Sequence, residues 1–352
     1  MDVRLSAEQR ALREAAARLV DDHAPGSVAD LDDAARVAGL EAALTGAGWR
    51  ELRAPDPDGG GRPLASAVEA AIVAEEFGRG PADAPFLGPT LAAELRRRAG
   101  AEPAAALETV LLRPDLSGLV VLDDEQARCS GVAIDARGAA AALALVRTGH
   151  DDGHGHDLVR VPVTGTSPGR DLTRPAAAVG DAPAERLPAA GPLTTADIEA
   201  WSAFALALTC ADLVGTMRGA VGLARAYAGV RRQYEALIGT FQSVQHLLAD
   251  AFVSVEGSSS VTRHAAWAAD ALPSGDALAA ASIAKAYCAR AAREVCETAI
   301  QVHGGIGMTW ECLAHVHLRR ALVSAQLLGD VGVNLARVAA HHEIGGGHDG
   351  LR

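Results

Sequence analysis

The sequence lacks the segments that mark membrane and exported proteins. Among its 352 residues, no uninterrupted apolar run reaches the ~20 residues that a membrane-spanning helix needs. The first twenty residues, MDVRLSAEQRALREAAARLV, carry charges early and have no apolar core of the kind found in a signal peptide. We therefore expect a soluble, cytoplasmic protein without a membrane-embedded segment.

Positive charge is also scarce. The chain has 32 lysines and arginines against 44 aspartates and glutamates, a formal net charge of −12. Its basic runs are short, such as Arg96–Arg98 and Arg319–Arg320. Binding to nucleic acid or to an anionic membrane surface requires clustered positive charge, so we expect neither as a main partner.

The cysteines form no recognisable framework. They are odd in number and include no C-x-x-C pair: Cys129, Cys210, Cys288, Cys296 and Cys312. This spacing argues against disulfide pairing and against a zinc site. In the alanine-rich stretch around Cys288 and Cys296 we expect buried thiols that act as small apolar groups.

Other site signatures are weak or missing. The segment Gly149–Asp157 has the composition of a metal-binding loop, but its glycines give no rigid presentation, so a solvated hairpin is the favoured interpretation and no metal is expected. No Ser-His-Asp arrangement or nucleophile elbow is visible. The four tryptophans are expected to pack in the interior rather than to form a cofactor cage; they are Trp49, Trp201, Trp267 and Trp310.

The composition is that of an ordinary globular protein, with 49% hydrophobic and 22% charged residues. Local patterns change twice along the chain, which predicts an α+β protein with several parts. We expect an N-terminal helical domain over 1–112, a middle β domain forming a partial barrel over 113–193, a C-terminal four-helix bundle over 194–342, and a flexible tail over 343–352.

The first region carries clear helix boundaries. Ser6 and Gln9 form a capping-box pattern ahead of leucines at helical spacing. A second helix is predicted over Leu64–Phe77, because it is followed by Gly78-Arg79-Gly80-Pro81, the glycine-then-proline order typical of a helix end. A third is predicted over Pro89–Ala99.

The middle region contains short apolar runs bounded by Gly, Asp or Pro, which predict strands over 118–122, 141–146 and 158–162. The last region is helical again, with predicted helices over 195–232, 240–270, 276–302 and 311–342. The first of these would be ~55 Å long at the usual helical rise, a length typical of bundles and of subunit interfaces.

Two segments stand out chemically. Val230–Gln242 (VRRQYEALIGTFQ) ends the long helix with arginines, which a favourable interaction with the helix dipole could also explain. Ala299–Glu311 (AIQVHGGIGMTWE) ends another helix with glycines that let a ligand or a second backbone approach closely. The HGGIG turn is neither a Walker loop nor a Rossmann fingerprint, since it lacks the GK[ST] ending and follows a helix.

Together these two segments resemble the acyl-CoA dehydrogenase family. Further pieces similar to that family occur in the same order along the chain, and the resemblance covers nearly all of it: Leu5–Leu12, Gly48–Gly60, Ala74–Gly78 and Asp171–Pro175. The resemblance implies that FAD lies between domains and against a neighbouring subunit. It also implies α,β-dehydrogenation of an acyl thioester, in which a carboxylate removes the α-proton and the flavin accepts the β-hydride.

The resemblance assigns site residues by position. Arg231 and Gln233 would meet the FAD pyrophosphate of the adjacent subunit, and Phe241 and Gln242 would lie along the cofactor. The adenosine half would be contacted by one continuous segment: Gln301, Val302, His303, Gly304 and Gly305.

The catalytic base has no obvious residue. The two positions that carry it in the family fall here on Leu328 and Ala205, and neither side chain can take a proton. Asp212 lies on the same predicted helix as Ala205 and is a weak candidate, but seven residues separate them, roughly 10 Å along a helix. A structural hydrogen bond or an interface pair is the alternative for Asp212.

Two more departures concern the flavin. Tyr234-Glu235 stands where the family usually has Phe-Gly, and the β domain has no tryptophan to flank a flavin. The resemblance is therefore to the shorter members that assemble with a longer paralogue. We expect an acyl-CoA-dehydrogenase-like flavoprotein subunit, in a homo-oligomer or with such a paralogue, acting on an acyl-CoA or acyl-carrier-protein thioester. The alternatives are a catalytically silent partner that completes a paralogue's FAD site and a non-redox acyl-thioester enzyme on this fold.

Overall fold

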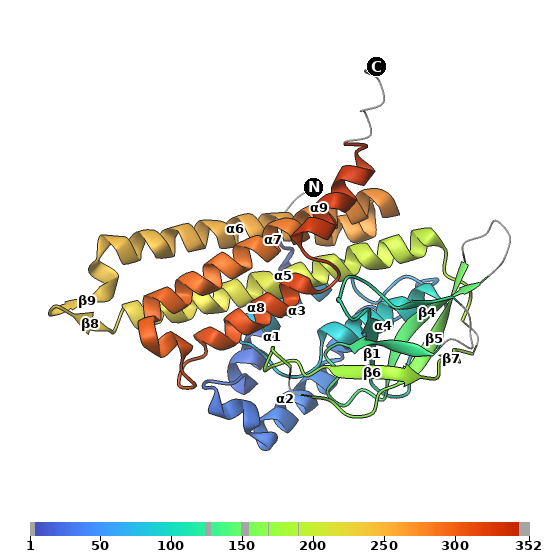
Figure 1. Ribbon diagram of the computed structural model, residues 1–352, viewed down its shortest axis with the longest axis horizontal. Helices are drawn as coiled ribbons and strands as arrows, with labels where there is room; N and C mark the ends of the chain where they lie inside the picture. Colours follow the sequence, from blue (N-terminus) through green and yellow to red (C-terminus); the bar gives the residue numbers. More distant parts are fainter. Residues whose placement is uncertain (1–3, 124–127, 149–154, 168, 189, 345–352) are drawn as a thin grey trace, which may run out of the picture.

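The computed structural model describes residues 4–123, 128–148, 155–167, 169–188 and 190–344. Figure 1 shows long helices side by side along the longest axis of the molecule, with the N-terminal helices beneath one half and a sheet beneath the other. This arrangement confirms the predicted α+β architecture.

The N-terminal part consists of four α-helices. They are α1 (Ala7–His23), α2 (Ala34–Ala47), α3 (Ala67–Arg79) and α4 (Leu87–Arg98), with short 3₁₀ turns η1 (Ala29–Asp32) and η2 (Trp49–Glu51). The predicted capping box at Ser6 and Gln9 is present. The predicted stop is also confirmed, since α3 ends at Arg79 and Gly80 follows as its C-cap.

The middle part is a seven-stranded sheet with strand order β6-β3-β1-β4-β5-β7, and β2 also pairs with β4. The strands are β1 (Glu108–Leu112), β2 (Val121–Leu122), β3 (Cys129–Ala133), β4 (Ala141–Thr148), β5 (Gly155–Pro162), β6 (Ala177–Ala182) and β7 (Glu185–Arg186). The three predicted runs match β2, β4 and β5. The sequence analysis did not predict β3 and β6, because their alanines and glycines have low strand propensity and the strands depend on pairing with each other.

The sheet curves around its own apolar core, as a partial barrel does. That core gathers side chains from several strands, among them Leu111, Val146, Val159 and Val179. Because β1 begins at Glu108, the sheet starts before the predicted domain boundary at residue 112.

The C-terminal part is a bundle of long helices. They are α5 (Thr195–Ala228), α6 (Gln242–Ala271), α7 (Ser274–His303), α8 (Ala314–Gln326) and α9 (Val331–His341). The first three match predicted helices closely. The single helix predicted over 311–342 is wrong: the chain breaks between α8 and α9, where Leu328 and Gly329 have φ of 64° and 99°. A right-handed helix cannot continue through two residues in the left-handed region.

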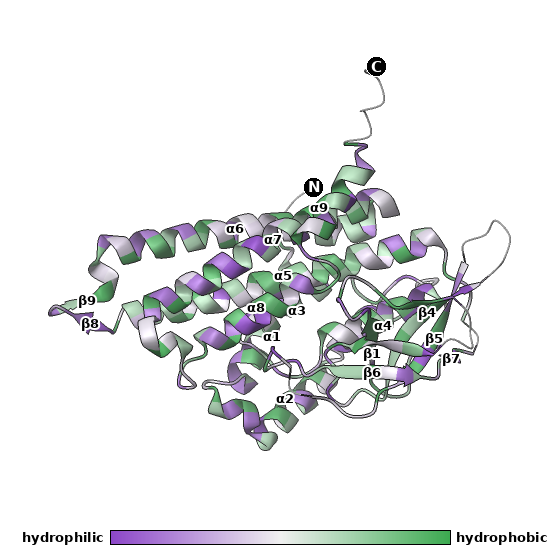
Figure 2. Ribbon diagram, in the orientation of Figure 1, coloured by the Kyte–Doolittle hydropathy of each residue, from purple (hydrophilic) through white to green (hydrophobic). Residues whose placement is uncertain are grey.

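Helix α5 is the axis of the fold. It packs against α3, α6, α7 and α8, and Figure 2 shows it as apolar over most of its length. It is long and apolar enough to cross a membrane by length and composition, but 89% of its most apolar window is buried inside the protein. That burial is typical of the core helix of a soluble protein.

Several sequence-based expectations concern residues inside or beyond this core. All five cysteines are free, and Cys288 and Cys296 are buried in α7 as predicted. Most of the histidine-rich segment, residues 149–154, lies outside the described residues, as do residues 345–352 of the predicted tail. Within the described residues, no group of three His, Cys, Asp or Glu side chains could hold a metal ion.

Glycines bring α3 and α5 into backbone contact. A Cβ atom added at Gly215 would stand 1.8 Å from the Glu75 carbonyl oxygen, and one at Gly78 would stand 2.3 Å from the Asp212 carbonyl oxygen. Both neighbours are backbone atoms, which cannot move aside without moving a helix. The N-terminal domain can therefore dock on the bundle only because these positions carry no side chain.

A buried cluster of charged side chains lies next to this contact, where the three parts of the chain meet. Asp212 of α5 accepts hydrogen bonds from Arg320 of α8 at 2.9 and 2.6 Å, and from Arg174 of the loop before β6 at 3.1 Å. Ser324 of α8 donates to the same carboxylate at 2.7 Å. All four side chains are almost completely inaccessible to solvent.

The cluster extends into the other two parts of the chain. The Arg320 guanidinium also donates to the Ala82 carbonyl, between α3 and α4, and to the Thr173 hydroxyl, at 2.9 and 2.8 Å. Arg174 forms a second ion pair, with Asp171, at 2.8 Å. The N-terminal helices, the β domain and the bundle are thus joined through these arginines.

We expect Gly215→Ala to lower the midpoint of thermal unfolding, because the new methyl group has no room against the α3 backbone. Overpacking of this kind costs about 1–3 kcal/mol. The matched control is Gly222→Ala on the same helix, where a Cβ atom would meet nothing within 4 Å. The control should be neutral or stabilise by roughly 0.5–1 kcal/mol. Equal midpoints for the two variants would contradict the close packing.

We expect Asp212→Asn to destabilise the protein by about 3–5 kcal/mol, because the buried Arg320 guanidinium loses the carboxylate with which it pairs and Arg174 keeps only Asp171. The control is Glu297→Gln, which breaks an exposed pair with Arg293 on α7 and should leave the unfolding midpoint nearly unchanged, since solvent screens such pairs. Both are measured by chemical denaturation. If Asp212→Asn left the unfolding midpoint unchanged, the cluster would not hold the domains together.

Candidate functional site

The two distinctive segments of the sequence meet at one end of the bundle. The end of α5, the start of α6 and the end of α7 lie together there, beside the small hairpin labelled β8 and β9 in Figure 1. The Tyr227 ring, near the end of α5, stacks on the His303 ring at the end of α7 with 4.7 Å between ring centroids. Residues about seventy positions apart in the chain thus form one surface, which we call the bundle-end surface.

The hairpin of this surface consists of β8 (Arg232–Gln233) and β9 (Ala236–Leu237). Its two-residue turn, Tyr234-Glu235, has φ of 50° and 64°, as the tightest antiparallel hairpins require. A glycine adopts such angles without strain, and Glu235 adopts them here despite its side chain. Tyr234 is 93% exposed, so the hairpin projects away from its own chain.

The predicted FAD-contacting side chains lie along this projecting edge. Arg231 and Gln233 are exposed on the hairpin. Phe241 is half-buried and forms the N-cap of α6, while Gln242 begins the helix with an exposed side chain. No side chain in the described part of the chain caps this helix, so its first amide groups can donate to an acidic ligand.

The end of α7 contributes mainly backbone. Gln301 is exposed, whereas the side chains of Val302 and His303 point into the protein. The His303 ring lies 2.8 Å from the Ala299 carbonyl through Nδ1. Gly304 has φ of 66°, and neither it nor Gly305 has an atom within 4 Å of an added Cβ. Any ligand contact of residues 302–305 would therefore be made by the main chain.

These residues fit a dinucleotide such as FAD. A guanidinium, three amide side chains, a helix N-terminus and two unobstructed glycines can donate hydrogen bonds to a pyrophosphate and to ribose hydroxyls. The side chains of this surface that could bind FAD are exposed in the single chain, so a bound cofactor would need a second wall. Exposed apolar side chains border the surface, among them Val230, Ile306 and Met308, and such groupings commonly mark contact with another chain.

The family position of the base, Leu328, lies in the turn between α8 and α9. Its backbone N–H donates to the Leu116 carbonyl at 2.7 Å, which joins this turn to the β domain. The turn is also held by Lys285, whose ammonium group donates to the carbonyls of Ala325 and Gly329 at 2.8 and 3.1 Å. Burial lowers the pKa of Lys285 to about 8. The turn is thus held by several hydrogen bonds, but the side chain at the family position of the base is a leucine, which cannot accept a proton.

The other two candidates for the catalytic base, Ala205 and Asp212, are also unsuited to accepting a proton. Ala205 is completely buried in α5. Burial by itself would raise the pKa of Asp212, but the charges of Arg174 and Arg320 outweigh this and hold the pKa below its usual range. Since both carboxylate oxygens accept hydrogen bonds, the geometry favours the structural alternative for Asp212 over the role of base.

Sequence reasoning missed two charged groups near this cluster. Asp135 receives the N–H groups of Phe86 and Gly88 through one oxygen, and burial raises its pKa. Arg137, two residues later, has a buried Nε that meets no hydrogen-bond partner in the part of the chain that the structure describes. The one local signal in the sequence for an ion pair in this region is the spacing of three residues between Asp171 and Arg174. Trp310 was expected to pack in the interior, but it is 64% exposed.

Comparison with known proteins agrees with this architecture. Residues 6–102 match the model of the acyl-CoA dehydrogenase N-terminal domain, and residues 204–342 match that of the C-terminal domain. The chain is 33% identical to the acyl-CoA dehydrogenase IpdE2 of Mycobacterium tuberculosis over 91% of its length and 93% of that protein. It is 29% identical to IpdE2 of Mycolicibacterium smegmatis over 96% of its length and 99% of that protein.

Solved structures share the fold. A steroid acyl-CoA dehydrogenase named Tcur3481-Tcur3483 matches with a TM-score of 0.78 and 24% identity over 97% of this chain and 99% of that one. The butyryl-CoA dehydrogenase of Megasphaera elsdenii matches with a TM-score of 0.75 and 18% identity over 97% and 100%. With two domain models matched in order and a relative aligned over nearly its full length, this chain belongs to the acyl-CoA dehydrogenase family of oxidoreductases.

Proposed function

We propose that this chain is one subunit of an FAD-dependent enzyme that dehydrogenates an acyl-CoA or acyl-carrier-protein thioester, assembled with a longer member of its family. Its bundle-end surface binds the pyrophosphate and adenosine half of an FAD whose flavin lies against the partner. When bound, FAD supplies the acceptor for the hydride that leaves the β-carbon of the thioester. The catalytic base comes from the partner.

The observation that carries this proposal is the convergence of the Arg231 segment and the Gln301–Gly305 segment on one exposed end of the bundle, linked by the Tyr227–His303 stack. The Arg231 guanidinium is placed to pair with a phosphate, and the exposed amides of Gln233, Gln242 and Gln301 can hydrogen-bond neutral oxygens. Each of these groups faces away from its own chain, which is the arrangement that a cofactor shared between subunits requires.

The proposal that the enzyme contains a second, different subunit rests on the side chains at the family's two positions for the catalytic base. Removal of an α-proton needs a group within hydrogen-bond reach of the α-carbon whose pKa suits proton transfer. Ala205 and Leu328 cannot accept a proton, and Asp212 is a poor base because two guanidinium groups stabilise its ionised form. Two structures of this fold carry paired names, the ChsE4–ChsE5 complex (TM-score 0.77, 21% identity) and Tcur3481-Tcur3483, which supports a two-component assembly here.

The purified chain alone should lack the visible absorption band of flavin and should not oxidise acyl thioesters. Co-expression with a longer paralogue should yield a stable complex that contains FAD and whose flavin is bleached by a thioester substrate. Stoichiometric FAD and thioester oxidation by the chain alone would contradict the shared-site proposal. FAD that no thioester bleaches would favour the non-redox alternative instead.

Within such a complex, Arg231→Gln should weaken FAD binding about ten- to a hundredfold, since a charge-assisted hydrogen bond contributes roughly 1.5–3 kcal/mol. The control is Arg147→Gln in the β domain, which removes another exposed guanidinium, one that pairs with Asp123. FAD release is followed by its fluorescence. Equal FAD affinity in the Arg231 and Arg147 variants would show that the bundle-end surface does not hold the cofactor.

A further inference from the structure

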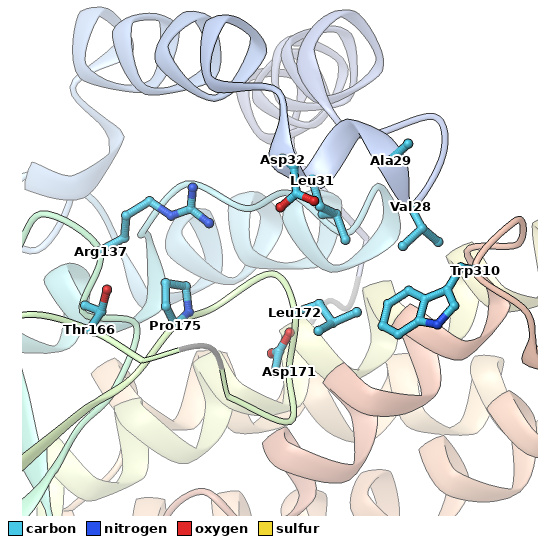
Figure 3. A pocket seen from close by; sticks show the side chains of 10 residues that line it. All are labelled: Val28, Ala29, Leu31, Asp32, Arg137, Thr166, Asp171, Leu172, Pro175 and Trp310. Carbon is cyan, nitrogen blue, oxygen red and sulfur yellow. The ribbon is translucent and has the colours of Figure 1, made fainter.

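A cavity of 730 Å³ opens between three parts of the chain, away from the bundle-end surface residues assigned above. Figure 3 shows its walls: the turn after α1 with Val28 and Asp32, the β-domain loop with Asp171 and Leu172, and Trp310 from the segment before α8. Small-molecule sites commonly have volumes of about 300–1,000 Å³ and mostly apolar walls. Trp310 and Asp171 belong to segments that carry the family resemblance, but no residue with an assigned role in FAD binding or as catalytic base lines this cavity.

The apolar wall is part of the folded core. Val28 packs with Leu313 and Val316 at the start of α8, and Leu31 and Leu172 pack against this small cluster. The neighbouring Asp171 carboxylate is fixed by the Thr173 backbone and hydroxyl at 2.9 and 2.7 Å, in addition to its pair with Arg174. The cavity wall is therefore held in place by groups that belong to the buried charge cluster.

Trp310 presents an oriented aromatic surface to the same space. Its ring meets the edge of the His315 ring at 5.2 Å between centroids, and the Arg319 guanidinium lies 5.8 Å from its centroid. These two contacts hold the indole from the side of α8. Trp310 as a whole is 64% exposed, and its ring faces Leu172 and Val28 in Figure 3.

Arg137 forms the polar end of the cavity. Its backbone is fixed because the preceding residue, Ala136, donates its N–H to the Pro175 carbonyl at 2.8 Å. Figure 3 shows the guanidinium pointing away from Thr166, into the space between Pro175 and the turn that carries Asp32. Its Nε is buried and has no hydrogen-bond partner, and no ion pair of Arg137 occurs among the described residues. A buried donor of a charged group that lacks a partner is unfavourable, and a bound acceptor would remove this cost.

We propose that this cavity binds an organic monocarboxylate with an apolar ring body. The carboxylate pairs with Arg137, whose planar guanidinium matches the geometry of two carboxylate oxygens. The ring body lies against Val28, Leu172 and Trp310. A polyphosphate is disfavoured, because the Asp32 and Asp171 carboxylates line the same space and would repel additional negative charge. The inference does not depend on the proposed function.

The test compares two ligands of nearly equal shape, 2-naphthoate and the neutral 2-naphthamide, by calorimetric titration of the whole chain. The native protein should bind the carboxylate at least tenfold more tightly than the amide. Arg137→Gln should abolish this preference by weakening the carboxylate about ten- to a hundredfold and leaving the amide unchanged. Trp310→Leu should weaken both ligands to the same extent, because it removes the ring contact and not the charge.

Asp32→Asn is the matched control, since it also removes a charge from the cavity wall at an exposed position. It should bind 2-naphthoate at least as tightly as the native protein. Thermal unfolding midpoints within the range of the native protein confirm that each variant is folded. The proposal is overturned if native protein does not distinguish the two ligands, or if Arg137→Gln retains the preference for the carboxylate.

Discussion

The structure depends on one buried interaction, the pairing of Asp212 with Arg174 and Arg320. A buried ion pair is not by itself a strong source of stability, because desolvation of its charges offsets much of their attraction. Its importance lies in fixing the positions of the three parts of the chain relative to one another. The two arginines come from different parts of the chain and also bind Ala82, Thr173 and Asp171, so a single carboxylate on the central helix determines how all three parts meet.

The same interaction explains why a carboxylate can stand on α5 and still be unsuited to catalysis. A general base must be able to exchange a proton near the working pH. Two guanidinium groups make the ionised form of Asp212 strongly preferred, and the surrounding helices exclude substrate. The turn at Leu328 is similar: its N–H donates to the Leu116 carbonyl, and its own carbonyls accept hydrogen bonds from Lys285 and Arg337, yet its side chain is apolar.

Charged and amide side chains therefore have different roles in different parts of the molecule. The buried charges around Asp212 join the domains, whereas Arg231, Gln233, Gln242 and Gln301 are exposed at the end of the bundle. That end also carries projecting apolar side chains such as Tyr234 and Met308. A surface that combines hydrogen-bond donors with exposed apolar groups is suited to a ligand enclosed between two chains, and less suited to a site within one chain.

The sequence by itself determined the elements whose boundaries and periodicity are set by residues close together in the chain. Caps at Ser6 and Gly80, the long apolar periodicity of α5–α7 and the glycines at 304–305 could be interpreted from neighbouring residues alone. The family resemblance supplied the candidate site in the same way, through contiguous motifs. Only the tertiary structure decided the break at Leu328, the strands β3 and β6, the pairing of Asp212, and the cavity at Arg137. Each of these features depends on contacts between residues far apart in the chain. Such contacts produce no periodic pattern in the sequence from which they could be predicted.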